Sequence, residues 1–450
     1  MDKVLPESWV NLPFTSVFDI NGGTQPPKSE FIDEPKDGYV RLLQIRDFGL
    51  KPVPTYIPDK PNLRKCRKDD ILIARYGASI GRIVTDQEGA YNVALAKVKI
   101  PYPIDKTYVR RILESHIFQD PILAIQRTAQ NGFNKKDLNS INIPLLPLPE
   151  QKRIVAKLDK LFEQLEIIKA SLEKIPVLLK NFRQQVLTQA VTGKLTEEWR
   201  KGKELHAPVL LNDGNEVEFE IVKYFNLHPS WIKSALGNCA QISRGKFTAR
   251  PRNDPRYFSG KYPFMQIGDL PREGGIANSF SKTLNEEGKK ISKSFPKDTV
   301  VIAIVGATIG ITGILSKKMF FPDSLIGINS SSTLTNRYIE FHLRICKYGL
   351  REISYAGGGQ PNIKIPTIKN LEIALPSFEE QMEIVNRVEN LFVKSDAIED
   401  LYKSLKAKID KLPQSILHKA FKGELVPQLE SDGDARDLLE EIRKLKTKIN

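Results

Sequence analysis

The stretches LPLPEQKRIVAKLDKLFEQLE (146–166) and SFEEQMEIVNRVENLFVKSDAIE (377–399) lie in one chain of 450 residues and match each other at an offset of 230. At that offset, residues 150–196 align with residues 380–426 without a gap, and twelve of the 47 positions are identical. A period of this length indicates a tandem duplication and not a solenoid, whose repeats are much shorter. The chain therefore contains two copies of one unit.

The region before each matching stretch also corresponds, but more loosely. Each copy thus consists of a variable globular part followed by a nearly constant helix. The corresponding landmarks are Pro6 and Trp9 with Pro229 and Trp231, LLQIRD (42–47) with FMQIGD (264–269), and ILIARYGASIG (71–81) with VVIAIVGATIG (300–310).

Apolar residues recur in both helical stretches at alternating spacings of four and three, which is the heptad pattern of a coiled coil. An isolated helix would expose such a stripe to water, so we expect the two helices to pair; ordinary helices of a bundle are the alternative. About thirty mostly polar residues (197–227) connect the copies, so an antiparallel pair would place one globular unit at each end. The expected seam residues are Leu158, Leu161, Leu165, Ile168, Leu172, Val388, Leu391, Ile398, Tyr402 and Leu405.

Local signals mark the ends of these helices. Ser377 opens a capping-box pattern, and Gly193 and Gly423 fit the position just past a helix end. Pro176 and Pro413 lie inside the patterns, and each should kink or interrupt its helix because proline lacks a backbone donor.

The globular parts carry short apolar runs, rich in Ile, Val and Tyr, between Gly, Pro and Asn residues, which is typical of strands. Residues 107–126 and 336–354 have the pattern of amphipathic helices. The predicted fold class is therefore α/β, with two mixed α/β units, two long helices and a pseudo-two-fold tandem repeat. The expected parts are 1–149 (first globular unit), 150–196 (helical region), 197–227 (connection), 228–379 (second globular unit), 380–428 (helical region) and 429–450 (C-terminal tail).

Composition limits the class of protein. The chain holds 68 Lys and Arg against 54 Asp and Glu, a net charge of +14, and its pI near 9.4 favours a polyanionic partner such as nucleic acid. Three widely separated cysteines exclude a disulfide framework and a Cys-x-x-Cys metal site. The sequence has no run long and apolar enough for a membrane span and no secretory signal, so we expect a cytoplasmic protein.

Two kinds of loop in each copy are candidates for contact with DNA. Gly-x-x-x-Gly loops (77–81 and 306–310) permit close backbone approach, and amide- and lysine-rich loops (130–136 and 357–364) could read adenine and meet phosphate. Basic clusters suit backbone contact, whereas tight turns and solvated surface loops are the alternatives. The candidate DNA-binding residues are Arg64, Lys65, Arg75, Ser79, Arg82, Asn131, Asn134, Lys135, Lys136, Arg244, Lys246, Arg250, Arg252, Arg256, Thr308, Gln360, Asn362 and Lys364.

Catalytic signatures are missing from the sequence. It has no P-loop motif, its five histidines lack metal-ligand spacing, and the amino-methyltransferase signature is absent. Glu287 and Lys289, with Asp269 upstream, could imitate a nuclease metal site, but such triplets arise easily by chance. We therefore predict no catalytic residue and no metal site, and a role as a reader or scaffold.

In these features the chain resembles the specificity (S) subunit of type I restriction-modification systems over nearly all its length. The resemblance rests on the two stretches quoted first and on LPESW (5–9), FRQQVLTQAVTGKLTEEWR (182–200) and SILHKAFKGELVPQ (415–428). It implies two target recognition domains, each reading one half of a bipartite DNA site, and an antiparallel coiled coil that fixes the gap.

The resemblance also implies partners and cofactors outside this chain. Two modification (M) subunits would methylate adenine with S-adenosylmethionine, and restriction (R) subunits would use ATP and Mg for translocation and cleavage. No family motif fixes the base-contacting residues, so the contact candidates rest on loop position and residue type. A stand-alone metal-dependent DNA-cleaving enzyme and a protein-only coiled-coil adaptor are the alternatives.

Overall fold

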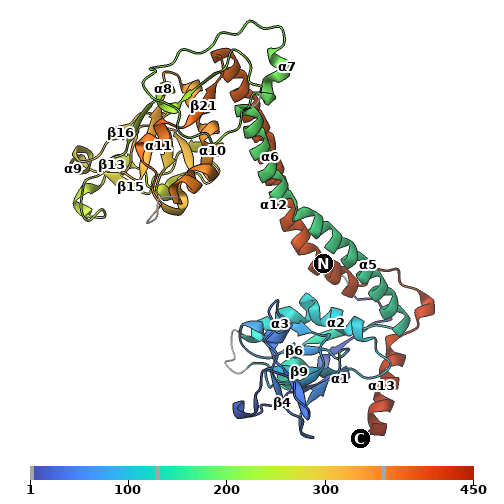
Figure 1. Ribbon diagram of the computed structural model, residues 1–450. Helices are drawn as coiled ribbons and strands as arrows, with labels where there is room; N and C mark the ends of the chain where they lie inside the picture. The colour runs from blue at the N-terminus through green and yellow to red at the C-terminus, as the bar shows by residue number, and fades with distance from the viewer. Residues whose placement is uncertain (1–4, 127–131, 225, 356–360, 450) are drawn as a thin grey trace. The chain divides into compact units, whose positions relative to one another are not determined.

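The computed structural model describes residues 5–126, 132–224, 226–355 and 361–449. The chain divides into two compact units, with residues 1–173 and 403–450 in unit 1 and residues 174–402 in unit 2 (Figure 1). Each unit combines small sheets, short helices and parts of the long helices, so the predicted mixed α/β class is confirmed.

Unit 1 is built from two described four-stranded sheets and a two-stranded ribbon. Its main core lies between the first sheet and the helices around it, where Phe14, Tyr108 and Phe118 are fully buried. The first sheet has the order β2 (Asp19–Gly22), β9 (Leu95–Lys99), β6 (Leu72–Ala74), β7 (Ile83–Val84); the second has β4 (Tyr56–Pro58), β3 (Tyr39–Leu43), β8 (Gly89–Tyr91), β5 (Lys65–Cys66); the ribbon pairs β1 (Val10–Pro13) with β10 (Asn142–Leu145). The helices are α1 (Phe14–Val17), α2 (Lys106–Glu114), α3 (His116–Gln126), α4 (Lys135–Asn139) and α5 (Leu148–Leu172).

Unit 2 repeats this plan with a larger first sheet. Its core again lies between that sheet and the helix that follows it, where Tyr338, Ile302 and Ile328 are fully buried. The first sheet has the order β12 (Gln241–Arg244), β20 (Leu325–Asn329), β17 (Val300–Ala303), β18 (Thr312–Leu315), β14 (Ile276–Ala277); the second has β15 (Lys282–Leu284), β13 (Phe258–Phe264), β19 (Met319–Phe320), β16 (Ser294–Phe295); the ribbon pairs β11 (Ile232–Ala235) with β21 (Glu372–Leu375). The helices are α6 (Ile175–Val191), α7 (Glu197–Arg200), α8 (Leu236–Cys239), α9 (Glu286–Lys290), α10 (Thr333–Tyr355) and α11 (Ile365–Lys369).

One buried contact fastens the start of each unit to its long helix. The indole Nε1 of Trp9 donates to Oε2 of Glu150 at 2.7 Å, and that of Trp231 donates to Oε2 of Glu380 at 2.8 Å. Both carboxylates are buried, and an unpartnered indole N–H there would cost free energy. The repeated Trp and Glu residues therefore hold the same joint in both copies.

The long helices follow the sequence prediction with two differences. The first helical region is interrupted between α5 and α6, because Pro176 occupies the first turn of α6. For Pro413 a kink or an interruption was predicted; an interruption does not occur, since α12 (Phe378–Phe421) continues through this residue. Gly193 and Gly423 follow the helix ends with φ of +79° and +75°, as predicted.

Residues 107–126, expected as one helix, form the separate helices α2 and α3. Residues 336–354 lie inside the single helix α10, as predicted.

Within unit 2, α6 and the start of α12 run in opposite directions. Arg183 of α6 contacts Asp396 and Glu399, whereas Arg200, further along the chain, contacts the earlier Glu380.

The predicted seam is only partly buried. Leu158, Leu165, Leu172 and Val388 are buried, Leu161, Leu391 and Tyr402 are half-buried, and Ile168, Ile398 and Leu405 are exposed.

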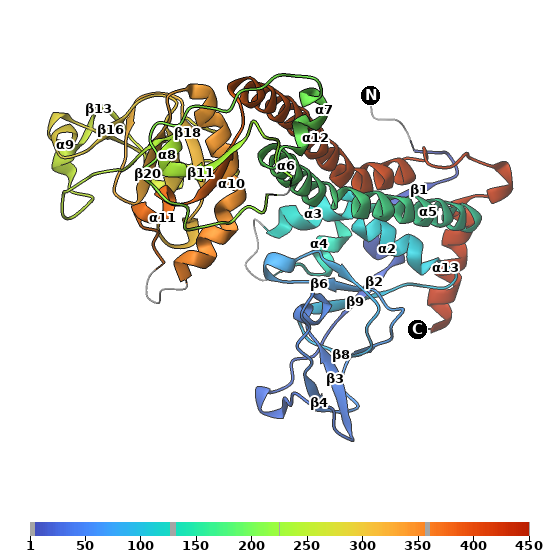
Figure 2. The same ribbon diagram turned by 45° about the horizontal axis from the view of Figure 1, so that its top comes forward.

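The C-terminal tail packs on unit 1. Helix α13 (Ala435–Ile449) buries Ala435, Leu438 and Ile442 in the unit 1 core, and the Ala435 N–H donates to the Ser8 carbonyl at 2.9 Å. Figure 2 shows α13 beside the elements of unit 1. The tail is therefore a structural part of this unit.

Candidate nucleic-acid interface

Each unit presents a glycine loop at the end of a central strand. The short turns at Gly77–Ser79 and Gly306–Thr308 follow β6 and β17. Their first glycines have φ of +65° and +61°, and Gly81 and Gly310 also have positive φ, a conformation that other residues adopt at a cost. The spacing of the glycines is therefore a requirement of the turn itself.

The structure brings the two predicted loops of each unit together. In unit 1, a Cβ added to Gly132 would lie 2.2 Å from the Arg75 carbonyl oxygen, and the Arg75 guanidinium lies 3.4 Å from the Phe133 carbonyl. In unit 2, Val305 pairs with Asn362, and the Gly306 N–H donates to the Pro361 carbonyl at 2.9 Å. Residues about 55 positions apart thus form one paired-loop surface in each unit.

Some candidate side chains are engaged in structural contacts. The Asn134 side chain accepts hydrogen bonds from the first turn of α4, and the Thr308 hydroxyl donates to the Val305 carbonyl at 2.8 Å. Lys65 forms an ion pair with Asp59, and Arg82 donates to the Phe48 carbonyl. Ser79 is half-buried at the edge of its turn, and Asn131 and Gln360 lie outside the described residues.

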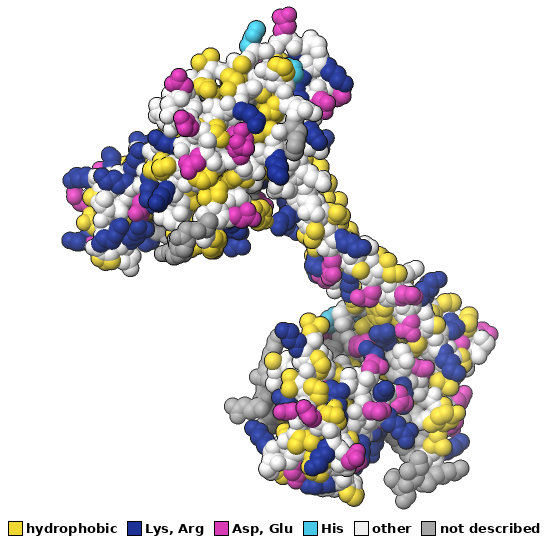
Figure 3. Space-filling model, viewed as in Figure 1, with side chains coloured by type: hydrophobic (Ala, Val, Ile, Leu, Met, Phe, Trp, Pro, Cys, Tyr) yellow, Lys and Arg dark blue, Asp and Glu magenta, His cyan; other side chains and the backbone are white. Residues whose placement is uncertain are grey.

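The basic cluster of unit 2 is also held internally. Arg244 donates to the Asp323 carbonyl, and Arg252 forms an ion pair with the Asp323 carboxylate at 2.7 Å. Arg250 donates to the Phe247 and Ala249 carbonyls. Arg256 forms an ion pair with Asp254 at 2.6 Å, and its hydrogen bond lowers the pKa of the Asp254 carboxyl group. Figure 3 shows Lys and Arg side chains gathered over the part of unit 2 that contains α9 and β13.

Other candidates remain available. Arg64, Lys136, Lys246 and Lys364 are exposed and form no ion pair with any described residue. Asn362 is exposed beside Lys364 at the paired loops of unit 2. These side chains have the chemistry to meet phosphates and base edges.

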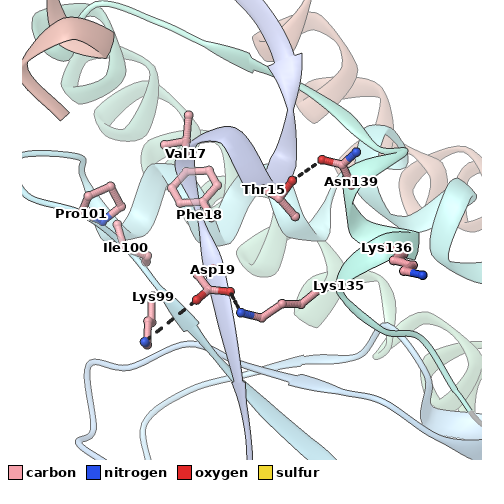
Figure 4. A pocket seen from close by; sticks show the side chains of 10 residues that line it. All are labelled: Thr15, Val17, Phe18, Asp19, Lys99, Ile100, Pro101, Lys135, Lys136 and Asn139. Atoms are coloured by element: carbon pink, nitrogen blue, oxygen red, sulfur yellow. Dashed lines mark hydrogen bonds and ion pairs between the residues drawn. The ribbon is translucent and has the colours of Figure 1, made fainter. Parts of the chain in front are cut away.

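A hollow of about 740 Å³ adjoins α4 in unit 1 (Figure 4). Val17 and Phe18 contribute apolar surface, and Asp19 contacts Lys135 at 2.6 Å and Lys99 at 4.0 Å. Burial alone would raise the pKa of Asp19, but the hydrogen bond and charge of Lys135 hold it below its ordinary value. Asp19 thus neutralises Lys135, which leaves Lys136 as the free cation of this pair.

An aromatic residue in the unit 1 loop was missed by the sequence analysis. Tyr76 is 37% exposed, and the Arg75 guanidinium lies 5.1 Å from its ring centroid. The signal was present, because Tyr76 directly precedes the first loop glycine. The Lys282 ammonium lies 4.6 Å from the Phe258 ring centroid. The sequence does not predict this contact, because Lys282 and Phe258 lie on different strands that only the sheet brings together.

The metal-site hypothesis finds no support in the described residues. Glu287 pairs with Lys290 on the surface of α9, and Asp269 accepts hydrogen bonds from Gln266 and Ser281. Among the residues described, no group of three His, Cys, Asp or Glu could hold a metal ion. Likewise, no described helix has both the length and the apolar character of a membrane span.

Comparisons with known families and sequences agree with this architecture. The family model for the type I restriction modification DNA specificity domain matches residues 6–177 and again 230–407. The EcoKI specificity subunit of Escherichia coli is 27% identical, covering 98% of this chain and 96% of its own length. The MjaVIII specificity subunit of Methanocaldococcus jannaschii is 23% identical, with 94% of both chains covered.

Solved structures show the same fold. A chain from a structural study of type I restriction-modification assembly superposes with a TM-score of 0.66 at 18% identity, covering 94% of this chain and 99% of that one. The HsdS subunit from Thermoanaerobacter tengcongensis gives a TM-score of 0.61 at 17% identity, covering 93% and 98%.

Proposed function

Because this chain belongs to the type I restriction-modification DNA specificity family, we propose that unit 1 and unit 2 each recognise one half of a bipartite DNA sequence. The duplication carries this proposal, since the family model matches twice and each copy presents one pair of loops. Two similar readers on one chain suit a site with two separated parts. As a specificity subunit, the chain selects the sequence and leaves the chemistry to its partners.

The paired loops and the exposed cations of each unit make the DNA contacts. Exposed Asn362 can read a base edge, because an amide offers a donor and an acceptor together. Lys246 and Lys364 in unit 2, and Arg64 and Lys136 in unit 1, neutralise backbone phosphates.

The long helices act as an antiparallel coiled coil that fixes the gap between the half-sites. The opposite course of α6 and α12 in unit 2 supports this role. So does the division of α12, whose first part belongs to unit 2 and whose second part belongs to unit 1. A continuous helix shared by both readers resists changes in their separation, which a gapped site requires.

Partner subunits dock on the same helices. Large apolar side chains with 60% or more of their surface exposed occur along them, namely Ile167, Val177, Leu178, Val393 and Leu401. Exposed apolar surface of this kind marks protein interfaces. We assign it to two M subunits, which bring S-adenosylmethionine for adenine methylation; R subunits bring ATP and Mg for cleavage, and the complex works in the cytoplasm.

Base-modification sequencing of host DNA, with the gene present and deleted, tests this function. We expect a gapped adenine-methylation motif that disappears on deletion and returns when the chain and its M partner are restored. Replacing residues 10–140 with those of a relative should change one half of the motif only. An unchanged motif after this exchange would contradict the assignment.

A length change in the helices separates the spacer role from recognition. Seven residues inserted into α6 and seven into the facing part of α12 lengthen the spacer by about 10 Å. We expect the gap in the methylated motif to widen by about three base pairs, with both half-sites unchanged. A motif with the original gap would refute the spacer role and leave the two readers standing.

A further inference from the structure

Unit 2 contains a small basic hollow that begins at Gly310, where its glycine loop ends. The hollow has a volume of about 120 Å³ and lies between α6, α10 and the turn at Arg272–Gly274. Helix α10 packs against α6 and β18, and Figures 1 and 2 both place α6 beside α10. Five cations line it, namely Lys180, Arg183, Arg272, Arg344 and Lys347.

Two of these cations are held by carboxylates. Arg183 contacts Asp396 at 2.6 Å and Glu399 at 2.8 Å. Arg344 lies 3.8 Å from the buried Glu340, whose Oε2 has no hydrogen-bond partner. Arg344 therefore lines the hollow and also lies near a buried carboxylate.

The other three cations are only partly compensated by the residues in the described ranges. Lys180, Arg272 and Lys347 form no ion pair there, and Glu273 is the sole acidic side chain in the lining. Burial lowers the pKa of Lys347 below its ordinary value, the positive charge of Arg351 lowers it further, and the carboxylate of Glu273 offsets part of this shift. Five cations share the lining with one carboxylate, so their mutual repulsion is only partly offset and a bound anion would relieve it.

The fold does not require these cations, because unit 1 lacks them. The Tyr108 hydroxyl donates to the Pro144 carbonyl at 2.6 Å, and the Tyr338 hydroxyl donates to the Ala374 carbonyl at 2.7 Å. Both members of the second pair lie 230 positions after those of the first, so this offset also gives the unit 1 equivalents of the residues that line the hollow. In unit 1 the positions of Lys180, Arg183, Arg344 and Lys347 are occupied by Asp410, Pro413, Glu114 and Ile117.

We propose that this hollow binds a phosphate group, which is either a phosphate of the DNA backbone or a free phosphate anion. Its size admits one small anion, and its guanidinium and ammonium groups are the donors that bind phosphate oxygens best. The site extends the proposed function, which places DNA contact at the loops. Phosphate binding can be tested without DNA, so it can fail or succeed independently of that function.

The test removes two exposed cations of the hollow together. The full-length Lys180→Gln/Arg272→Gln chain is compared with Lys51→Gln/Lys318→Gln, which loses the same charge from exposed lysines elsewhere. Isothermal titration with inorganic phosphate, at constant ionic strength, should show at least tenfold weaker binding for the hollow variant only. Circular dichroism confirms that both variants are folded.

Duplex DNA containing the methylated motif distinguishes the two sources of phosphate. If a backbone phosphate occupies the hollow, the slope of log K against log salt decreases by about one in the hollow variant, and the methylated motif stays the same. Phosphate binding with an unchanged slope identifies a free anion. If phosphate does not bind and the salt slope is unchanged, the proposal is overturned. If the hollow variant then loses binding to the M subunit, the cations instead contact an acidic protein surface.

Discussion

Acid should destabilise unit 2 through one buried histidine. His342 of α10 is fully buried, with its Nδ1 3.2 Å from the Tyr224 hydroxyl and its Nε2 3.4 Å from Cys346 Sγ. Burial lowers the pKa of His342 from 6.5 to about 4, because the loss of hydration disfavours the imidazolium more than the backbone hydrogen bond of Glu372 favours it. The unfolded chain therefore binds more protons than the folded one between these pH values.

The direction and size of the change in unfolding free energy follow from this difference in bound protons. The free energy of unfolding is unaffected by His342 above pH 6.5 and falls as the pH decreases towards 4. The full loss is about 3 kcal/mol, since each pH unit of pKa difference corresponds to about 1.4 kcal/mol. The loss should be complete near the folded pKa of about 4.

Urea unfolding, followed by tryptophan fluorescence, measures this effect because Trp199 and Trp231 both lie in unit 2. The His342→Gln variant keeps an acceptor for the Tyr224 hydroxyl but cannot titrate. We expect the wild type to lose about 3 kcal/mol more than the variant between pH 7 and pH 4. Parallel pH profiles of the unfolding free energy for the two chains would show that His342 does not cause the acid destabilisation.

Three further predictions concern the loops and the buried joints. Gly310→Ala should lower the free energy of unfolding by about 1–3 kcal/mol, because φ is +80° and the new Cβ would lie 2.9 Å from the α10 backbone. Urea unfolding measures this loss. Gly268→Ala is the control, because a Cβ at that position meets nothing within 4 Å. Glu380→Ala should lower the free energy of unfolding by about 3–5 kcal/mol, because it breaks a buried ion pair as well as an indole hydrogen bond. Glu150→Ala should lower it by about 1–3 kcal/mol, because an indole hydrogen bond is lost. Equal losses in thermal unfolding would contradict this ranking. Lys246→Ala should weaken DNA binding about equally for all sequences and reduce the salt slope by about one, and a changed methylation motif would argue for base contact in place of phosphate contact.

The helices show how far local pattern reaches. Heptad spacing and terminal glycines are local properties, so they placed α12 and the end of α6 correctly. Proline gave different outcomes at two positions. Pro176 fell where a new helix could begin, whereas Pro413 is flanked by Ile409 and Leu417, whose burial in unit 1 holds α12 together across the missing hydrogen bond.

The candidate site could be predicted only as separate segments. Residue types marked both loops of each unit, and the structure joined Val305 to Asn362 and Arg75 to Phe133 across tens of residues. The same folding removed Asn134 from the free side chains, because it caps α4. Which charges remain free depends on neighbours distant in the sequence, as Asp19 shows for Lys135.

The duplication, the mixed α/β class and the long helices could be predicted from the order of residues, because they depend on repeats and periodicities. The family could be recognised from specific stretches such as LPESW (5–9) and SILHKAFKGELVPQ (415–428). The packing of the C-terminal helix on unit 1, the pairing of the two kinds of loop, and the gathering of five cations around one hollow of unit 2 could be seen only in the folded chain. The physical reason is that burial and charge compensation are set by contacts between distant segments. Lys180 and Lys347 are 167 positions apart, yet they share one site because α10 packs on α6.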